Sequence, residues 1–415
     1  MEIFVRFVVA FAGFFFLTRL LTRKHTQQLS KVELLLAFSA KVAMGCIYGW
    51  VFLKWYGGDD TWYFNQDSMA ELDKLKNRTL YFFEDINPFL HARNLGWSKG
   101  LAHFREKLEL ALIIKPLAIF NFFSNGNYYL NVIAFSFIGF WGHYWLYRFL
   151  LPYWSQKKVL LFAIVFLFPP SLFWLSGIRT DSWLFFFFSL LLYSFDQLLQ
   201  KKKRVAALVC LLAFSGMIIC RSAFAGLTVP ILVSWWLVKQ HGFPARKAFL
   251  YSLGVLTLIF LASSYFPSPF NLPMYLVKIQ EGFMELTGNT RVELGKLEPT
   301  PLSFIQNAPK ALGNAWLEPL PHLAKGVLQK LSFIDNVLLI VLLLLAILGV
   351  FNNKGNNKPT HPIWMGLAIY AFLGYLLIGY TIPFPGASAR YKAIVELCWV
   401  VWAFNMIRWK NLFRL

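Results

Sequence analysis

Charged residues are scarce in this sequence: they make up 14% of its 415 residues, while hydrophobic residues make up 58%. A soluble domain usually has about 25% charged and about 45–50% apolar residues. Here the apolar residues come in runs of roughly 17–25, the length that crosses a bilayer, and no hydrophilic stretch is long enough for a sizeable core of its own. The composition excludes an ordinary soluble protein. It predicts an all-α, polytopic transmembrane bundle that forms a single domain over residues 1–415.

Cysteine is also rare, with four residues, all in or beside apolar runs: Cys46, Cys210, Cys220 and Cys398. Their spacing fits neither a metal site nor a disulfide framework, so we expect small buried hydrophobic side chains. No Walker loop, dinucleotide fingerprint, Ser/His/Asp grouping or Cys/His metal pattern stands out. These absences turn attention to the polar residues at the ends of the apolar runs.

About eleven membrane spans are predicted by the apolar runs. We place them at 3–20, 32–53, 127–149, 158–176, 182–199, 204–220, 222–238, 248–266, 332–351, 362–382 and 391–408. The run 108–123 is interrupted by Lys115-Pro116, which predicts an amphipathic helix along the membrane surface rather than a span. We expect the apolar N-terminal stretch to be retained, because no small-residue cleavage site follows it.

Acidic residues are half as numerous as basic ones, 20 against 40, and the excess positive charge lies in alternate connections. Six of these hold nineteen basic residues and no acidic one: 18–31, 147–158, 200–204, 239–247, 352–358 and 407–415. The positive-inside rule makes them cytoplasmic. The long connections 54–126 and 267–331 are then external loops, each with interfacial helices. A charge spread over short turns does not indicate nucleic-acid binding.

The segment "WYGGDDTWYFNQDSMAEL" (55–72) places carboxylates where an apolar run ends. Asp59 and Asp60 follow two glycines, and Asp67 comes seven residues after Asp60. Such a carboxylate can act as a general base or hold a cation. It can equally belong to a solvated turn that caps the next helix. The local sequence leaves both interpretations open.

Several cations also lie at the external ends of the predicted spans. In "SGIRTDSW" (176–183), Arg179 could hold an anion at a helix N-terminus, and Asp181 could simply cap that helix. Arg221 marks the turn between two spans, either as a snorkelling anchor or as a phosphate contact. The candidate residues for a lipid phosphate are Arg179, Arg221, His322, Arg390 and Lys392, although a structural role is an alternative for His322.

This arrangement resembles the GT-C superfamily of polytopic glycosyltransferases, which use polyprenyl-phosphate-linked sugars. More narrowly, it is similar to multi-spanning proteins of bacterial surface-polysaccharide loci. The resemblance rests on Gly58-Asp60-Thr61, "FWLSGIRTDS" (173–182), "APKALGNAWLEPLP" (308–321) and "GASARY" (386–391). Two departures stand out: Arg179-Thr180 replaces an expected Lys beside Asp, and Glu318 stands where the family would place Arg.

The resemblance implies inverting sugar transfer to a hydroxyl of a glycan, lipid or protein, at the periplasmic face of a bacterial cytoplasmic membrane. Asp60 is the expected catalytic base and Asp59 the second choice. Asp67 and Asp181 would orient the acceptor or bind a divalent cation such as Mg²⁺ or Mn²⁺, and the cations above would neutralise the lipid phosphate. The alternatives are a polysaccharide polymerase that takes a lipid-diphosphate glycan, a lipid-linked-glycan transporter and a non-catalytic scaffold.

Overall fold

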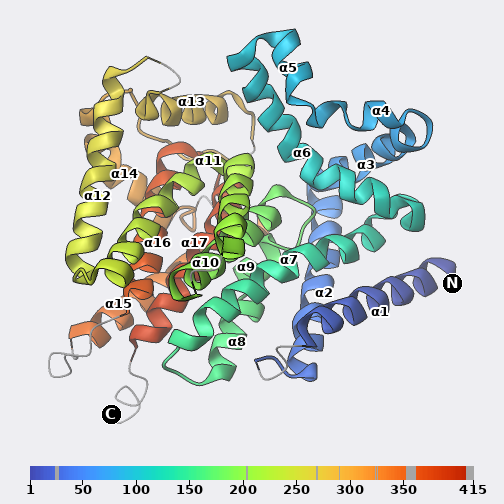
Figure 1. Cartoon of the computed structure of the whole chain (residues 1–415), viewed down its shortest axis with the longest axis horizontal. Helices are drawn as coiled ribbons and strands as arrows, with labels where there is room; N and C mark the ends of the chain where they lie inside the picture. The colour runs from blue at the N-terminus through green and yellow to red at the C-terminus, as the bar shows by residue number, and fades with distance from the viewer. Residues whose placement is uncertain are drawn as a thin grey trace. The chain divides into compact units, whose positions relative to one another are not determined.

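A computed structural model describes residues 1–415 apart from 24–27, 202–203, 268–269, 289, 323, 325, 352–360 and 408–415. Within these described residues every regular element is a helix, which confirms the all-α prediction for this part (Figure 1). The basic connection 352–358 lies outside the described residues, as do parts of 18–31, 200–204 and 407–415.

The chain divides into two compact units, each described by itself. Unit 1 consists of Met1–Pro152 and Val165–Ala225, and unit 2 of Tyr153–Ile164 and Gly226–Leu415. The expectation of one transmembrane domain over the whole chain stays a prediction.

Unit 1 contains the first seven α-helices and the segment that carries Arg179. Its helices are α1 (Glu2–Thr22), α2 (Lys31–Tyr56), α3 (Asp59–Asn77), α4 (Thr79–Phe82), η2 (Glu84–Ile86), α5 (Pro88–Leu95), α6 (Trp97–Ser124), α7 (Tyr128–Leu150), α9 (Pro169–Trp174), α10 (Thr180–Lys201) and the first part of α11 (Arg204–His241). The helices η3 (Leu151–Tyr153) and α8 (Lys158–Leu167) cross the boundaries between the units.

Unit 2 contains the C-terminal half of the chain. Its helices are the rest of α11, then α12 (Ala245–Ala262), η4 (Ser263–Tyr265), α13 (Leu272–Glu285), α14 (Pro301–Leu317), α15 (Val327–Phe351), α16 (Pro362–Thr381) and α17 (Pro385–Met406). In the loop 267–331, α13 and α14 bury Val277 and Phe304 in a cluster with Tyr380 of α16. The loop therefore contains helices, and their expected location at the membrane interface stays a prediction.

Seven helices of the described part are long and apolar enough to cross a membrane, which supports a multi-pass helical membrane protein. They are Glu2–Thr22, Lys31–Tyr56, Thr180–Gln200, Arg204–His241, Ala245–Tyr265, Val327–Leu348 and Pro362–Thr381. The expected count of eleven is not reached by this measure. The predicted spans 127–149 and 391–408 fall on α7 and α17, which are helices but are not among the seven.

Two of the span predictions concern places where a helix is interrupted. The expected span 158–176 is interrupted, because α8 ends at Leu167 and a new short helix begins at Pro169. Proline lacks the N–H that would continue the helical hydrogen bonds. The two spans expected on either side of Arg221 correspond to two helical segments of α11 that meet at a kink, where Arg221 has non-helical backbone angles (φ −156°, ψ 91°). The expected external turn is therefore a break of one residue.

The segment 108–123 is helical, as predicted, and belongs to the longer continuous helix α6; its expected place along the membrane surface stays a prediction. Pro116 lies inside the helix, and Ile113 and Leu117 beside it are each 1% exposed. Lys115 is also buried, and its ammonium group has acceptors within unit 1. With its charge paired, Lys115 does not require the surface location that the sequence indicated.

A buried network of amides and hydroxyls joins α3, α6 and α7. Asn131 of α7 donates to the side-chain oxygens of Asn65 on α3 (2.8 Å) and Asn121 on α6 (2.7 Å). Asn121 in turn donates to Ser68 of α3, and Ser124 of α6 donates to Asn131. Buried polar groups are costly unless they are hydrogen-bonded, so this network favours a single docking position for α3.

Candidate functional site

The two aspartates singled out by the sequence lie at a sharp junction between α2 and α3. Gly57 ends α2 with φ 67° and Gly58 follows with φ 106°, both in the region that favours glycine. Asp59 has φ 50°, an uncommon angle that aspartate tolerates better than most residues. Because α3 begins at Asp59, both carboxylates lie on the first turn of a helix that starts where a membrane-length helix ends.

The guanidinium of Arg179 bridges these carboxylates. One of its terminal nitrogens donates to Oδ2 of Asp60 at 2.9 Å, and the other donates to Oδ2 of Asp59. The Arg179 side chain is 4% exposed, against 38% for Asp59 and 57% for Asp60. The cation is therefore buried beneath two carboxylates that water can reach. We call these three residues the Asp–Asp–Arg site.

Electrostatics keep Arg179 charged although it is buried. Burial lowers its pKa, but Tyr48 and the carboxylates of Asp59 and Asp60 raise it, and the pKa lies above its ordinary value. Arg179 uses Oδ2 of each carboxylate, and Oδ1 of each has no hydrogen-bond donor in the part of the chain that the structure describes. The arrangement fixes two carboxylates in place and leaves an oxygen on each to accept a proton or a hydrogen bond.

The residues after Asp60 are anchored to the helices behind them. Thr61 shares a hydrogen bond of 2.7 Å with the Tyr128 hydroxyl, and the Trp62 indole donates to the Gly49 carbonyl at 2.9 Å. The rings of Trp62 and Tyr128 stack with their centroids 4.1 Å apart. A Cβ on Gly49 would lie 2.0 Å from the Tyr128 ring, so only glycine fits there. The start of α3 is therefore held rigidly against α2 and α7.

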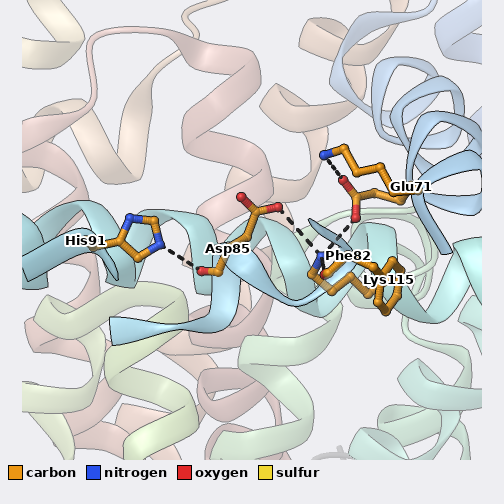
Figure 2. A network of polar contacts seen from close by, with 6 residues as sticks. Glu71, Phe82, Asp85, His91 and Lys115 are labelled. Carbon is orange, nitrogen blue, oxygen red and sulfur yellow. Dashed lines mark hydrogen bonds and ion pairs between the residues drawn. The ribbon is translucent and has the colours of Figure 1, made fainter. Parts of the chain in front are cut away.

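A second polar network in unit 1, centred on Lys115, was not found from the sequence (Figure 2). The Lys115 ammonium donates to Glu71 at 2.8 Å and lies 3.6 Å from a carboxylate oxygen of Asp85. Glu71 also accepts a hydrogen bond from Lys74, and this hydrogen bond is the main reason why the pKa of Lys74 is raised. The one signal in the sequence was a lysine inside an apolar run. The network joins α3, α6 and η2, so its arrangement is that of a structural link.

The other candidate site residues of unit 1 differ in how far their side chains are buried. Asp67 is exposed on α3, two turns beyond Asp60, so the two share one face of the helix. Asp181 is 3% exposed in the first turn of α10. Arg221 donates to the carboxylate of Glu109 and to the carbonyl of Cys220. Its expected role as a phosphate contact would compete with that ion pair.

In unit 2, the last helix α17 begins at Pro385, ahead of the predicted span 391–408, so that Arg390 and Lys392 both lie within it. Lys392 is 1% exposed and donates to the Ala315 carbonyl (2.9 Å) and the Asn336 side chain (3.1 Å). Arg390 is half-buried, and its guanidinium carbon lies 5.1 Å from the centroid of the Tyr391 ring. His322 is exposed. The lipid-phosphate roles of these residues stay predictions.

Metal binding also stays a prediction. Among the described residues no group of three or more His, Cys, Asp or Glu side chains is placed to hold a metal ion. Asp59 and Asp60 supply two carboxylates, but Arg179 already neutralises part of their charge. A divalent cation at this position would have to take its other ligands from water or from a substrate.

Comparison of the chain with protein-family models, with curated proteins and with solved structures finds no match in any of the three.

Proposed function

We propose that this chain is a membrane glycosyltransferase that moves a sugar from a polyprenyl-phosphate carrier to a hydroxyl acceptor on the external face of the membrane. The observation that carries the proposal is the Asp–Asp–Arg site: partly exposed carboxylates at the end of a membrane-length helix, fixed by a buried guanidinium. A lipid-borne donor and a water-borne acceptor can both reach such a position. The resemblance of the surrounding motifs to the GT-C superfamily supports the same reaction class.

In the proposed reaction Asp60 is the general base. Its side chain is the more exposed of the two, 57% against 38% for Asp59, and its Oδ1 accepts the proton of the acceptor hydroxyl. The acceptor oxygen forms a bond to the anomeric carbon as the bond from that carbon to the phosphate oxygen breaks, which inverts the configuration. The lipid phosphate leaves with the bonding electron pair. A positioned base contributes typically about 10²–10⁴-fold to such a rate.

Arg179 has a different part in this reaction from the phosphate contact that its sequence position indicated. Both terminal nitrogens of its guanidinium hold carboxylates. Arg179 therefore keeps Asp59 and Asp60 in one geometry before the acceptor arrives, and pre-positioning of this kind lowers the cost of reaching the transition state.

The test is to incubate the purified full-length protein with a panel of polyprenyl-phosphate sugars, each with a mixture of simple hydroxyl acceptors. Polyprenyl-diphosphate glycans form a second arm. We expect consumption of at least one monophosphate donor and release of polyprenyl phosphate. Consumption of diphosphate donors alone would replace the proposed donor class with that of a polymerase. No consumption in either arm, from protein shown to be folded, would contradict the proposal.

A further inference from the structure

The turn 175–179, which ends in Arg179, follows one face of α2 residue by residue. Residues 41, 45, 48 and 52 of α2 are three or four apart and therefore lie on one face of the helix. Lys41 contacts Leu175, position 45 faces Ser176, position 48 faces Gly177, and position 52 faces Arg179.

Close approach at the middle of the turn depends on two glycines. A Cβ on Gly45 would lie 2.9 Å from the carbonyl oxygen of Ser176, and one on Gly177 would lie 2.4 Å from the Tyr48 ring. At the end of the turn, the guanidinium carbon of Arg179 lies 5.5 Å from the centroid of the Phe52 ring. Close packing thus holds the middle and the end of the turn against α2.

Lys41 fixes the start of the turn. It is 1% exposed although it lies within a membrane-length helix, and its Nζ donates to the Leu175 carbonyl and to Nε2 of His143, which is 3.2 Å away. Gly139 of α7 leaves room for it, since a Cβ there would lie 2.8 Å from Cε of Lys41. An intramembrane lysine is costly, so one with specific partners is a candidate for a functional role.

His143 extends this contact to the break between α8 and α9. Its Nδ1 lies 2.6 Å from the Val165 carbonyl oxygen, so Nδ1 carries the proton and Nε2 is left to accept from Lys41. The helical partner of the Val165 carbonyl would be the N–H of residue 169, which is proline and has none. Lys41 and His143 therefore hold carbonyls on both sides of α9, the short helix that leads into the turn.

We propose that Lys41, together with His143, is a positioning residue that sets the place of Arg179 in the Asp–Asp–Arg site. The chain of contacts is short. Lys41 donates to the Leu175 carbonyl, and four residues later the turn ends at Arg179, which donates to Asp59 and Asp60. Ser182 of α10 donates to the same Leu175 carbonyl at 2.8 Å and supports it from the other end of the turn. The inference rests on the proposed function only for its kinetic consequence.

The experiment measures how fast phenylglyoxal modifies individual arginines, by mass spectrometry of the full-length protein in detergent. In Lys41→Met we expect modification of Arg179 to accelerate about tenfold, because loss of a buried hydrogen bond loosens the turn, and modification of Arg221 to stay unchanged. Lys54→Met is the matched control, since Lys54 is an exposed lysine of the same helix. An unchanged rate at Arg179, or an equal rise at Arg179 and Arg221, would overturn the inference.

A second variant covers the case in which Lys41→Met does not fold. Ser182→Ala removes the other donor to the Leu175 carbonyl, and we expect a smaller acceleration at Arg179 in the same direction; no change there would overturn the inference. For the proposed transfer, Lys41→Met should lower kcat while KM for the donor changes by less than about twofold. Selective exposure of Arg179 without any transfer by the wild-type protein would remove the proposed function and leave the positioning inference standing.

Discussion

At the scale of single residues, the account depends on two carboxylates that share one guanidinium. Arginine suits this arrangement because its planar fork donates in two directions at once, whereas lysine offers a compact point charge. The Arg179 side chain is 4% exposed, so water cannot easily replace its hydrogen bonds to Asp59 and Asp60. We therefore expect the two carboxylates to be held in place by the geometry of the guanidinium as well as by its charge.

Substitution of Arg179 by lysine separates charge from geometry. We expect Arg179→Lys to lower the transfer rate about tenfold or more, because the single nitrogen of lysine cannot reproduce the spacing at which the two terminal nitrogens of the guanidinium hold Asp59 and Asp60. Its expression and unfolding temperature should stay close to those of the wild-type protein. Steady-state kinetics measured beside a thermal unfolding curve check this. A lysine variant with full activity would show that only the positive charge matters.

The sequence predicted that external aspartates and arginines, Asp59, Asp60 and Arg179 among them, converge in one pocket, but it did not predict that Arg179 pairs with both aspartates. Asp60 and Arg179 are 119 residues apart in the sequence, and local patterns give no information about such a pairing. The unusual features that could be recognised were the double glycine before the aspartates and an arginine between two apolar runs. The contact itself depends on how α2 packs against the turn 175–179, which hydropathy does not encode.

At the scale of elements, the loop 54–126 is a packed set of helices because buried polar links hold it together. Lys115-Pro116 interrupts the apolar run 108–123, and for that reason the sequence predicted an amphipathic surface helix there rather than a span. The structure keeps α6 continuous because Glu71, 44 residues earlier, supplies the counter-charge (Figure 2). The sequence predicted a helix over this segment, but the carboxylate that pairs with Lys115 is too distant in the sequence to be recognised from it.

The link between α3 and α6 gives a test of stability. Lys115→Met removes a donor that is 10% exposed and bonded to Glu71, which is 5% exposed, and we expect a loss of about 1–3 kcal/mol in the free energy of unfolding. Lys310→Met is the matched control, because the Lys310–Glu293 pair is 3.5 Å apart and Glu293 is 93% exposed. The control should change stability little.

Chemical unfolding in mild detergent, followed by tryptophan fluorescence, compares the two variants. If Lys115→Met were as stable as the control, the Lys115 network would not be what joins α3 to α6.

At the scale of the whole molecule, composition predicted the all-helical, membrane-spanning character, and seven helices of the described part support it. Length and hydropathy do not place α17 among these seven helices. It carries Arg390, Lys392 and Glu396 and is still largely buried. A charged residue inside the fold can be paired by a distant segment, and a count of apolar residues cannot anticipate this. The division into two compact units likewise had no signal in the sequence.

The predicted sidedness of the molecule rests on the distribution of positive charge in the sequence, and engineered cysteines can test it. In a variant without the native cysteines, we expect Asn77→Cys and Lys310→Cys to react with a membrane-impermeant maleimide on intact cells. Lys239→Cys, in a basic connection, should react only after the membrane is opened. All three positions are exposed, so burial does not confuse the comparison. Labelling of Lys239→Cys on intact cells would reverse the assignment.

The most direct test of the central claim is the transfer rate of Asp60→Asn, measured with whichever donor the wild-type protein consumes. Asparagine keeps the shape of the side chain and removes its ability to take a proton. Asp73→Asn is the control on the same helix, where an exposed carboxylate accepts from Asn77 at 2.7 Å. We expect Asp60→Asn to lose about 10²–10⁴-fold in rate with Asp73→Asn unaffected. A fully active Asp60→Asn protein would contradict the account.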